Sequence, residues 1–172
     1  MKDAHKPNRQ ANSPRHLARV FALLGLYQWI ADPTLRAAQI EDQLPPLLKE
    51  EDGSPIEGAG LTPDDFARCD RELLASLLSG TLAQNEAVAA VFTPFVDRDL
   101  KRISLVERAI LFLGTFELMN CPQTPYRVVL NEDVELAKRF GSGYRFTNAV
   151  LEKVAQKVRP EEFSADHAKK AE

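Results

Sequence analysis

Apolar residues recur at intervals of three and four along most of the chain, a spacing that predicts amphipathic helices. The clearest helix is expected to begin at Thr124 and Pro125, since a hydroxyl residue followed by proline is typical of a helix start. Gly141 and Gly143 are expected to end it in a turn. Its apolar face consists of Tyr126, Leu130, Val134 and Ala137, and its charged face of Glu132, Glu135, Lys138 and Arg139.

A second amphipathic helix is predicted directly after the glycine turn. Its inner stripe consists of Thr147, Val150, Leu151, Val154 and Val158. Four basic residues of this segment are expected to face solvent, namely Arg145, Lys153, Lys157 and Arg159.

The first helix of the chain is predicted over residues 13–32. Ser13 supplies the cap and Pro14 occupies the first helical position. Arg15 and Arg19 lie one turn apart, on the side away from the apolar stripe. Both guanidinium groups are therefore expected to face solvent.

The middle of the chain carries three further helical signals. A weaker helix over residues 34–49 is expected to be interrupted at its two consecutive prolines, and residues 50–60, rich in Gly, Pro and acids, indicate a surface loop. One long helix is predicted from residue 62 to residue 93, because a proline follows there. Ser104 and Glu107 fit a capping box ahead of a strongly apolar helix, which is expected to be central and nearly buried.

No segment alternates apolar and polar residues for long enough to predict a strand, so the expected fold is all-α, a compact bundle of about six or seven helices. We expect a flexible basic arm over residues 1–12 and a flexible tail over residues 161–172. Between them, residues 13–160 are predicted to form one helical domain with two subdomains, about 13–95 and 97–160.

Composition excludes several classes of protein. Hydrophobic residues make up 44% of the 172, enough for a globular core, but no apolar run is long enough to span a membrane and no signal region opens the chain. A cytoplasmic protein is expected. Cys69 and Cys121 form no disulfide framework or metal-ligand spacing, and His16 is the only histidine in a predicted element.

Candidate chemistry is sparse, so we expect no enzyme, no metal and no cofactor. The neighbouring acids Glu132, Asp133 and Glu135 are interpreted as a solvated helix face, because they point in several directions and no histidine or cysteine is near in sequence. The segments Gly58-Ala59-Gly60 and Gly141-Ser142-Gly143 do not fit a phosphate-binding loop and indicate turns.

The charges are unevenly distributed, although the formal net charge is only −3. Residues 1–30 carry a net charge of +4 and residues 138–160 a net charge of +5, whereas residues 41–72 carry −7. Basic ends around an acidic middle are compatible with a local site for a polyanion.

RNA is the polyanion that the residue types favour. Arg15 and Arg19 can contact phosphates, and Tyr144 and Phe146 flank Arg145 directly after the glycine turn. An unpaired base could stack on an aromatic ring there while the guanidinium contacts a phosphate. The alternative is that Phe146 only packs the helix start against the core.

Three blocks of the sequence resemble the NusB family of bacterial transcription antitermination factors. The densest is TPYRVVLNEDVELAKRFG, followed after a short loop by RFTNAVLEKVAQKVRP; the others are RHLARVFALLGLYQW and ISLVERAILFLGTFEL. The resemblance implies a non-catalytic factor that binds boxA-type single-stranded RNA of ribosomal RNA operon leaders together with ribosomal protein NusE. RNA polymerase and other Nus factors would be indirect partners.

The resemblance also implies roles for individual residues. Arg15 and Arg19 match family arginines and Phe146 matches a family aromatic, so these three residues and Arg145 are the expected RNA site. His16, Leu17 and Val20 replace residues that are often basic or acidic in the family, which makes the expected RNA surface less basic. We further expect the basic faces of the first and last of these helices to lie side by side, with the Phe146 ring exposed between them.

For the protein partner, the resemblance implies docking at Tyr27, Phe95 and Glu107. Each has a simpler explanation in core packing or, for Glu107, in helix capping. Two alternatives to an RNA-binding adaptor stay open. One is a helical targeting module related to the N-terminal domain of RNA cytosine methyltransferases, although no cofactor loop or α/β domain follows in this sequence; the other is a structural homodimer that masks its RNA surface.

Overall fold

The computed structural model describes residues 13–47 and 61–171, and in these residues it contains helices and no strand. The predicted arm over residues 1–12 and the predicted loop over residues 50–60 lie outside the described residues. The all-α prediction is confirmed. The helices are α1 (Pro14–Ala31), α2 (Ala37–Leu47), α3 (Pro63–Arg68), α4 (Arg71–Ala83), α5 (Asn85–Phe92), α6 (Leu105–Asn120), α7 (Tyr126–Arg139), α8 (Tyr144–Val158) and α9 (Pro160–Ala171), with short 3₁₀ helices η2 (Thr93–Phe95) and η3 (Leu100–Arg102).

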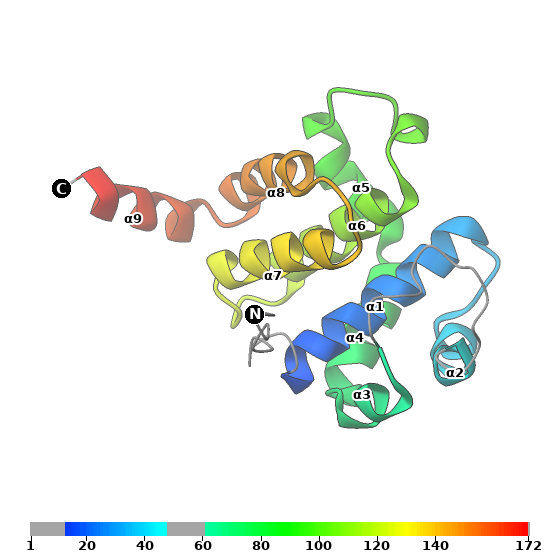
Figure 1. Cartoon of the computed structure of the whole chain (residues 1–172). Coiled ribbons are helices and arrows are strands. Elements are labelled where there is room, and N and C mark those ends of the chain that lie inside the picture. The colour runs from blue at the N-terminus through cyan, green and yellow to red at the C-terminus, as the bar shows by residue number, and fades with distance from the viewer. Residues whose placement is uncertain (1–12, 48–60, 172) are drawn as a thin grey trace, which may run out of the picture.

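Helices α1 and α6 form the centre of the molecule. Helix α1 packs against α2, α3, α4 and α6, and α6 also packs against α5, α7 and α8. Figure 1 shows α7 lying between α8 and the first half of α1. The buried hydrophobic residues of both halves of the chain form one continuous cluster, and the division into two subdomains stays a prediction.

Three helix ends lie where the sequence predicts them. The Ser13 side chain accepts a hydrogen bond from the His16 N–H, and the Ser104 side chain accepts one from the Glu107 N–H. Gly141 ends α7 with φ +70, a left-handed conformation that favours glycine. The prediction of a central, nearly buried helix after Ser104 is also confirmed, because most of α6 from Ala109 to Leu118 is buried.

The single long helix predicted over residues 62–93 is wrong, since the segment forms α3, α4 and α5. Cys69 is extended, the N–H of Asp70 donates to the Pro14 carbonyl at 2.9 Å, and the Asp70 carboxylate caps α4. This break is fixed by a contact with α1, which local sequence does not reveal. The interruption predicted at Pro45 and Pro46 is also absent, because α2 continues through both residues.

The start of α7 is capped by a residue near the end of the chain, and neither feature was predicted. Helix α7 begins at Tyr126 without a cap from Thr124, and the Tyr126 N–H instead donates to the carboxylate of Glu162 at 2.8 Å. Glu162 belongs to α9, which occupies the segment predicted to be a flexible tail. The cap of α7 therefore comes from a residue 36 positions further along the chain.

Candidate nucleic-acid interface

An open cleft of about 570 Å³ lies between the start of α1 and the side of α7. Arg15 is exposed at this cleft, and the neighbouring α7 positions offer amide and carboxylate groups. The lining residues are Ser13, Arg15, Arg19, Gln123, Thr124, Pro125, Val128, Asn131 and Glu132. A groove with a cation at one end and hydrogen-bonding groups along its wall can hold a polar, anionic chain.

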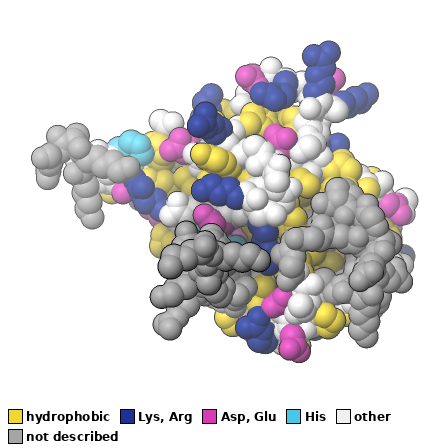
Figure 2. Space-filling view, in the orientation of Figure 1, with side chains coloured by type: hydrophobic (Ala, Val, Ile, Leu, Met, Phe, Trp, Pro, Cys, Tyr) yellow, Lys and Arg dark blue, Asp and Glu magenta, His cyan; other side chains and the backbone are white. Residues whose placement is uncertain are grey.

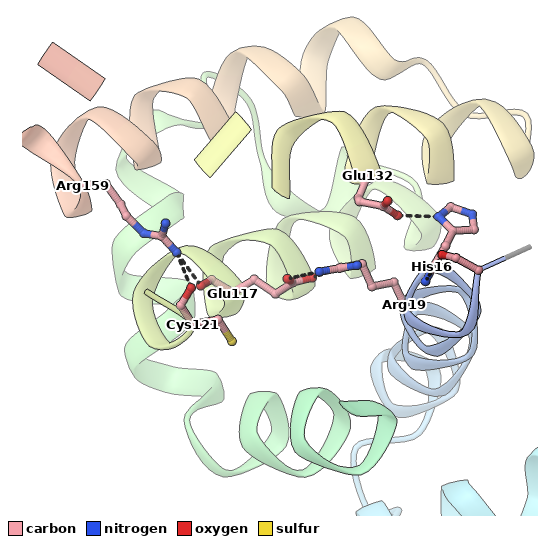
Figure 3. A network of polar contacts seen from close by, with 7 residues as sticks. His16, Arg19, Glu117, Cys121, Glu132 and Arg159 are labelled. Atoms are coloured by element: carbon pink, nitrogen blue, oxygen red, sulfur yellow. Dashed lines mark hydrogen bonds and ion pairs between the residues drawn. The ribbon is translucent and has the colours of Figure 1, made fainter. Parts of the chain in front are cut away.

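Arg19 does not face solvent, so the prediction of its exposure is wrong. Its side chain is 3% exposed and makes two hydrogen bonds to Glu117 of α6, at 2.8 and 3.1 Å (Figure 3). Burial by itself would lower the pKa of Arg19, but the hydrogen bond and the charge of Glu117 raise it above its usual value. Because α1 packs directly on α6 here, this guanidinium holds two helices together and is not presented to a phosphate.

His16 connects the same part of α1 to α7. Its ring is buried, and its Nδ1 contacts the carboxylate of Glu132, which is half-buried (Figure 3). His16 is one of the positions where this sequence departs from the basic pattern expected of the family. In this fold the residue joins two helices at the wall of the cleft.

Asp133 is buried, which corrects its assignment to a solvated acidic face. It is 2% exposed, and neither carboxylate oxygen has a hydrogen-bond partner among the described residues. Burial, and then the nearby charge of Glu117, raise the pKa of Asp133 well above its usual value. A Cβ on Gly114 would lie 2.3 Å from the Asp133 Oδ2, which shows how closely α6 approaches α7.

Arg159 is also buried, so the prediction that it faces solvent is wrong. It is 9% exposed and caps the C-terminal end of α6 (Figure 3). Its guanidinium donates to the carbonyls of Leu118 at 2.9 Å, Cys121 at 2.8 Å, Glu117 at 3.2 Å and Thr124 at 2.6 Å. A cation that satisfies the last carbonyls of a helix is also favoured by the helix dipole.

The start of α8 forms a second basic place, separate from the cleft. Arg145 is exposed and Phe146 is half-buried. The guanidinium of Arg98, from the segment between η2 and η3, lies 4.4 Å from the centre of the Phe146 ring. Figure 2 shows Lys and Arg side chains grouped over the η2–η3 segment at the top of the view. Sequence reasoning missed Arg98, because nothing near it in sequence indicates a contact with α8.

The expected juxtaposition of the basic faces of α1 and α8 is wrong. Helix α7 lies between α8 and the start of α1 (Figure 1), so Arg15 and Phe146 belong to different parts of the surface. The structure brings Arg145 and Phe146 together, places Arg15 at the cleft and buries Arg19. The Phe146 ring is partly accessible, with Arg98 on one face.

The three residues predicted to dock a protein partner are all half-buried. Tyr27 lies in the second half of α1, and Phe95 lies in η2 with the Lys157 Nζ 5.9 Å from its ring centre. Glu107 lies in the first turn of α6, where its carboxylate accepts a hydrogen bond from the Ser104 hydroxyl at 3.0 Å. A docking role for these residues stays a prediction.

No three His, Cys, Asp or Glu side chains in the described residues gather closely enough to hold a metal ion. Cys69 and Cys121 are buried free thiols, and burial raises the pKa of both. None of the described helices combines the length and the apolar character needed to cross a membrane.

The comparisons of this chain with known proteins all point to one family. The sequence model of the NusB family matches residues 16–156. A protein of Aromatoleum aromaticum is 44% identical over 157 residues, covering 90% of this chain and 97% of the relative. A protein of Ralstonia nicotianae is 39% identical, covering 93% and 94%, and one of Azoarcus sp. is 42% identical, covering 91% and 92%. All three relatives are named transcription antitermination protein NusB.

Proposed function

The chain belongs to the NusB family, and we propose that it is a non-catalytic transcription antitermination factor that binds boxA-type single-stranded RNA together with ribosomal protein NusE. The family match covers α1 from its third residue, all of α6 and α7, and most of α8. Of these helices, α1 and α7 line the cleft and α8 carries the second basic place, while Arg15 lies just before the matched residues. Membership supports the general role in transcription antitermination, and the RNA and the protein partner are the finer proposal.

The observation that supports RNA binding most directly is the cleft with Arg15 at its edge. Phosphate contacts from Lys and Arg supply most of the affinity of such complexes, and hydrogen-bonding side chains fix the position of the backbone. Arg15 is exposed, and Gln123 and Asn131 line the same cleft. One strand of RNA backbone in this cleft would bring its phosphates to Arg15 and its sugar hydroxyls to the amides.

The start of α8 is proposed to contact RNA at a second point. Arg145 is free to contact a phosphate, and Arg98 stacks on Phe146. Bases of single-stranded RNA stack on guanidinium planes as well as on aromatic rings. The outer face of the Arg98 guanidinium is therefore the proposed platform for a base, with the Phe146 ring supporting it from below.

Loss of Arg19 from the surface affects the strength of this interface. With Arg19 engaged by Glu117, Arg15 is the arginine of α1 that phosphates can reach. We propose that RNA binding by the isolated protein is weak and depends strongly on NusE. In this proposal α1 contributes little of the RNA affinity and mainly positions the RNA relative to NusE.

Titration of a fluorescently labelled boxA-type RNA at several salt concentrations, with and without NusE, tests the RNA proposal. Arg15→Gln is expected to weaken binding roughly three- to tenfold and to reduce the slope of log K against log salt by about 0.7. The control is Arg36→Gln, an equal change of charge at an exposed residue before α2, which should have little effect. Salt-independent binding, or equal losses for both variants, would contradict the proposal.

NusE docking at Tyr27, Phe95 and Glu107 needs a separate measurement. Calorimetry with purified NusE should show weaker binding by Tyr27→Ala, Phe95→Ala and Glu107→Gln, because aromatic and charged anchors carry much of the energy of an interface. Binding of RNA by the same variants without NusE serves as the internal control and should not change. Unchanged NusE affinity in all three single variants would remove this docking surface.

A further inference from the structure

Helix α9 is an element that the family match does not include. The match ends at residue 156, and α9 covers Pro160–Ala171. Figure 1 shows α9 projecting from the end of α8, away from the bundle of α1, α4 and α6. Its only apolar anchor in the described residues is Phe163, whose ring lies 5.6 Å from that of Tyr126. Such a peripheral helix is less firmly held than the core helices.

Two carboxylates of α9, Glu162 and Asp166, contact the first two residues of α7. The Asp166 Oδ2 accepts a hydrogen bond from the Tyr126 hydroxyl at 2.6 Å and one from the Arg127 Nε at 2.6 Å. The same oxygen also contacts the Arg127 Nη2. A carboxylate of α9 thus occupies the forked face of an arginine side chain, the face that also fits a phosphate.

Arg127 lies at the border of the cleft described above. Pro125 and Val128, on either side of it in sequence, line the cleft, and so does Asn131, which follows one helical turn later on the same face of α7. The Arg127 side chain is 47% exposed. Its guanidinium is therefore placed to reach a chain that runs through the cleft, once Asp166 releases it.

We propose that Arg127 is a further phosphate-binding residue of this cleft, and that Asp166 of α9 competes with RNA for it. In the free protein the carboxylate neutralises the guanidinium, and RNA binding replaces that carboxylate by a phosphate. An exposed ion pair is weak enough to be exchanged in this way. The inference rests on the proposed function, since it assigns the competing ligand to RNA.

Two substitutions in α9 that each remove one negative charge distinguish competition between Asp166 and RNA from a general electrostatic effect. Asp166→Asn keeps an acceptor for the Tyr126 hydroxyl but removes the carboxylate from Arg127. Glu161→Gln removes one negative charge at an exposed residue of the same helix. Asp166→Asn is expected to tighten binding of the boxA-type RNA roughly threefold or more and to steepen the salt slope by about 0.7, whereas Glu161→Gln changes both only slightly.

Arg127→Gln completes a double-mutant cycle. Alone it is expected to weaken RNA binding slightly, and in its presence Asp166→Asn should no longer increase the affinity. Circular dichroism and thermal unfolding of each variant establish that α9 and the core are intact. A gain from Asp166→Asn that persists without Arg127 would show that the carboxylate acts on another group.

The outcomes distinguish this inference from the proposed function. If the wild-type protein binds the RNA in a salt-dependent way but Asp166→Asn and Glu161→Gln behave alike, the role of α9 is refuted and the RNA function stands. If no variant binds the RNA with or without NusE, the proposed function fails and the assignment of Arg127 fails with it.

Discussion

Arginines in two regions of this molecule have opposite roles. Around α6, Arg19 and Arg159 are buried, and each is bonded to groups of that helix. At the rim, Arg15 and Arg145 are exposed. Arg15 and Arg19 are only one turn apart, so a single helix contributes one residue to each region.

The difference shows that position relative to α6 decides what a basic residue does. Near α6 the guanidinium is desolvated and has to be matched by a carboxylate or by helix-end carbonyls, because an unpaired buried charge is very costly. At the rim water solvates the charge, and the side chain stays available to a ligand. Substitutions in the two regions should therefore affect different measurements.

The largest effect is expected for Arg19→Met. The change leaves Glu117, whose side chain is 1% exposed, as a buried charge without its partner, at a cost of about 3–5 kcal/mol in the free energy of unfolding. Urea denaturation measures this loss. The double variant Arg19→Met/Glu117→Leu should recover most of it, since an apolar pair can replace a buried ion pair. Equal losses in the single and double variants would mean that the ion pair is not what the substitution removes.

Arg159→Met should cost somewhat less, about 2–4 kcal/mol, because it leaves the carbonyls at the end of α6 without their charged donor. Lys157→Met is the matched control, as it removes an exposed cation from the same part of α8. Thermal unfolding monitored by circular dichroism compares the two. Equal decreases in melting temperature for both variants would show that Arg159 contributes no more to stability than an exposed residue.

Asp133→Asn should change the pH dependence of stability. The pKa of Asp133 is raised in the folded protein above the usual value of 3.8, so between these two pKa values the folded state holds a proton that the unfolded state has released. Folding stability then falls as pH rises toward the folded-state pKa. The amide cannot lose a proton, so the variant should become progressively more stable than the wild type with rising pH. Parallel stability curves from pH 4 to pH 8 would contradict this.

The smallest effect is expected at the rim. Arg15→Gln and Arg145→Gln should leave the urea midpoint unchanged within error, since exposed substitutions away from caps and buried pairs rarely alter stability. The same two variants are the ones expected to lower RNA affinity. A marked loss of stability in either would show that the division between interior and rim is drawn in the wrong place.

Helix starts and stops with strong local chemistry could be predicted from the sequence. Ser13 and Ser104 each cap a helix, and Gly141 ends α7, because these signals act within one turn of the residue that carries them. The nearly buried character of α6 followed from its apolar composition. These features hold wherever the helix is placed in the fold.

Features that depend on distant partners could not be predicted. The break at Asp70 is tied to Pro14, and the start of α7 is capped by Glu162. Arg19 and Asp133 have the charge expected of surface residues, yet both lie beside Glu117 of α6. Helical periodicity assigns residues to faces of a helix, but it does not say which face another helix will cover. The predicted RNA site therefore included Arg19, which in the structure is buried in the core.

The contact between Arg19 and Glu117 joins residues 98 positions apart, and Arg159 reaches back 38 positions to Cys121. During synthesis, which proceeds from the N-terminus, α1 therefore leaves the ribosome long before the helix that neutralises its buried arginine exists. Most of the apolar surface of α1 becomes buried only when α4 and α6 are available, and the end of α6 is capped only when Arg159 is available. Nascent chains whose residues up to about 160 have not yet left the ribosome should thus lack a closed core and be open to proteases or chaperones, with cooperative folding following once α8 has emerged.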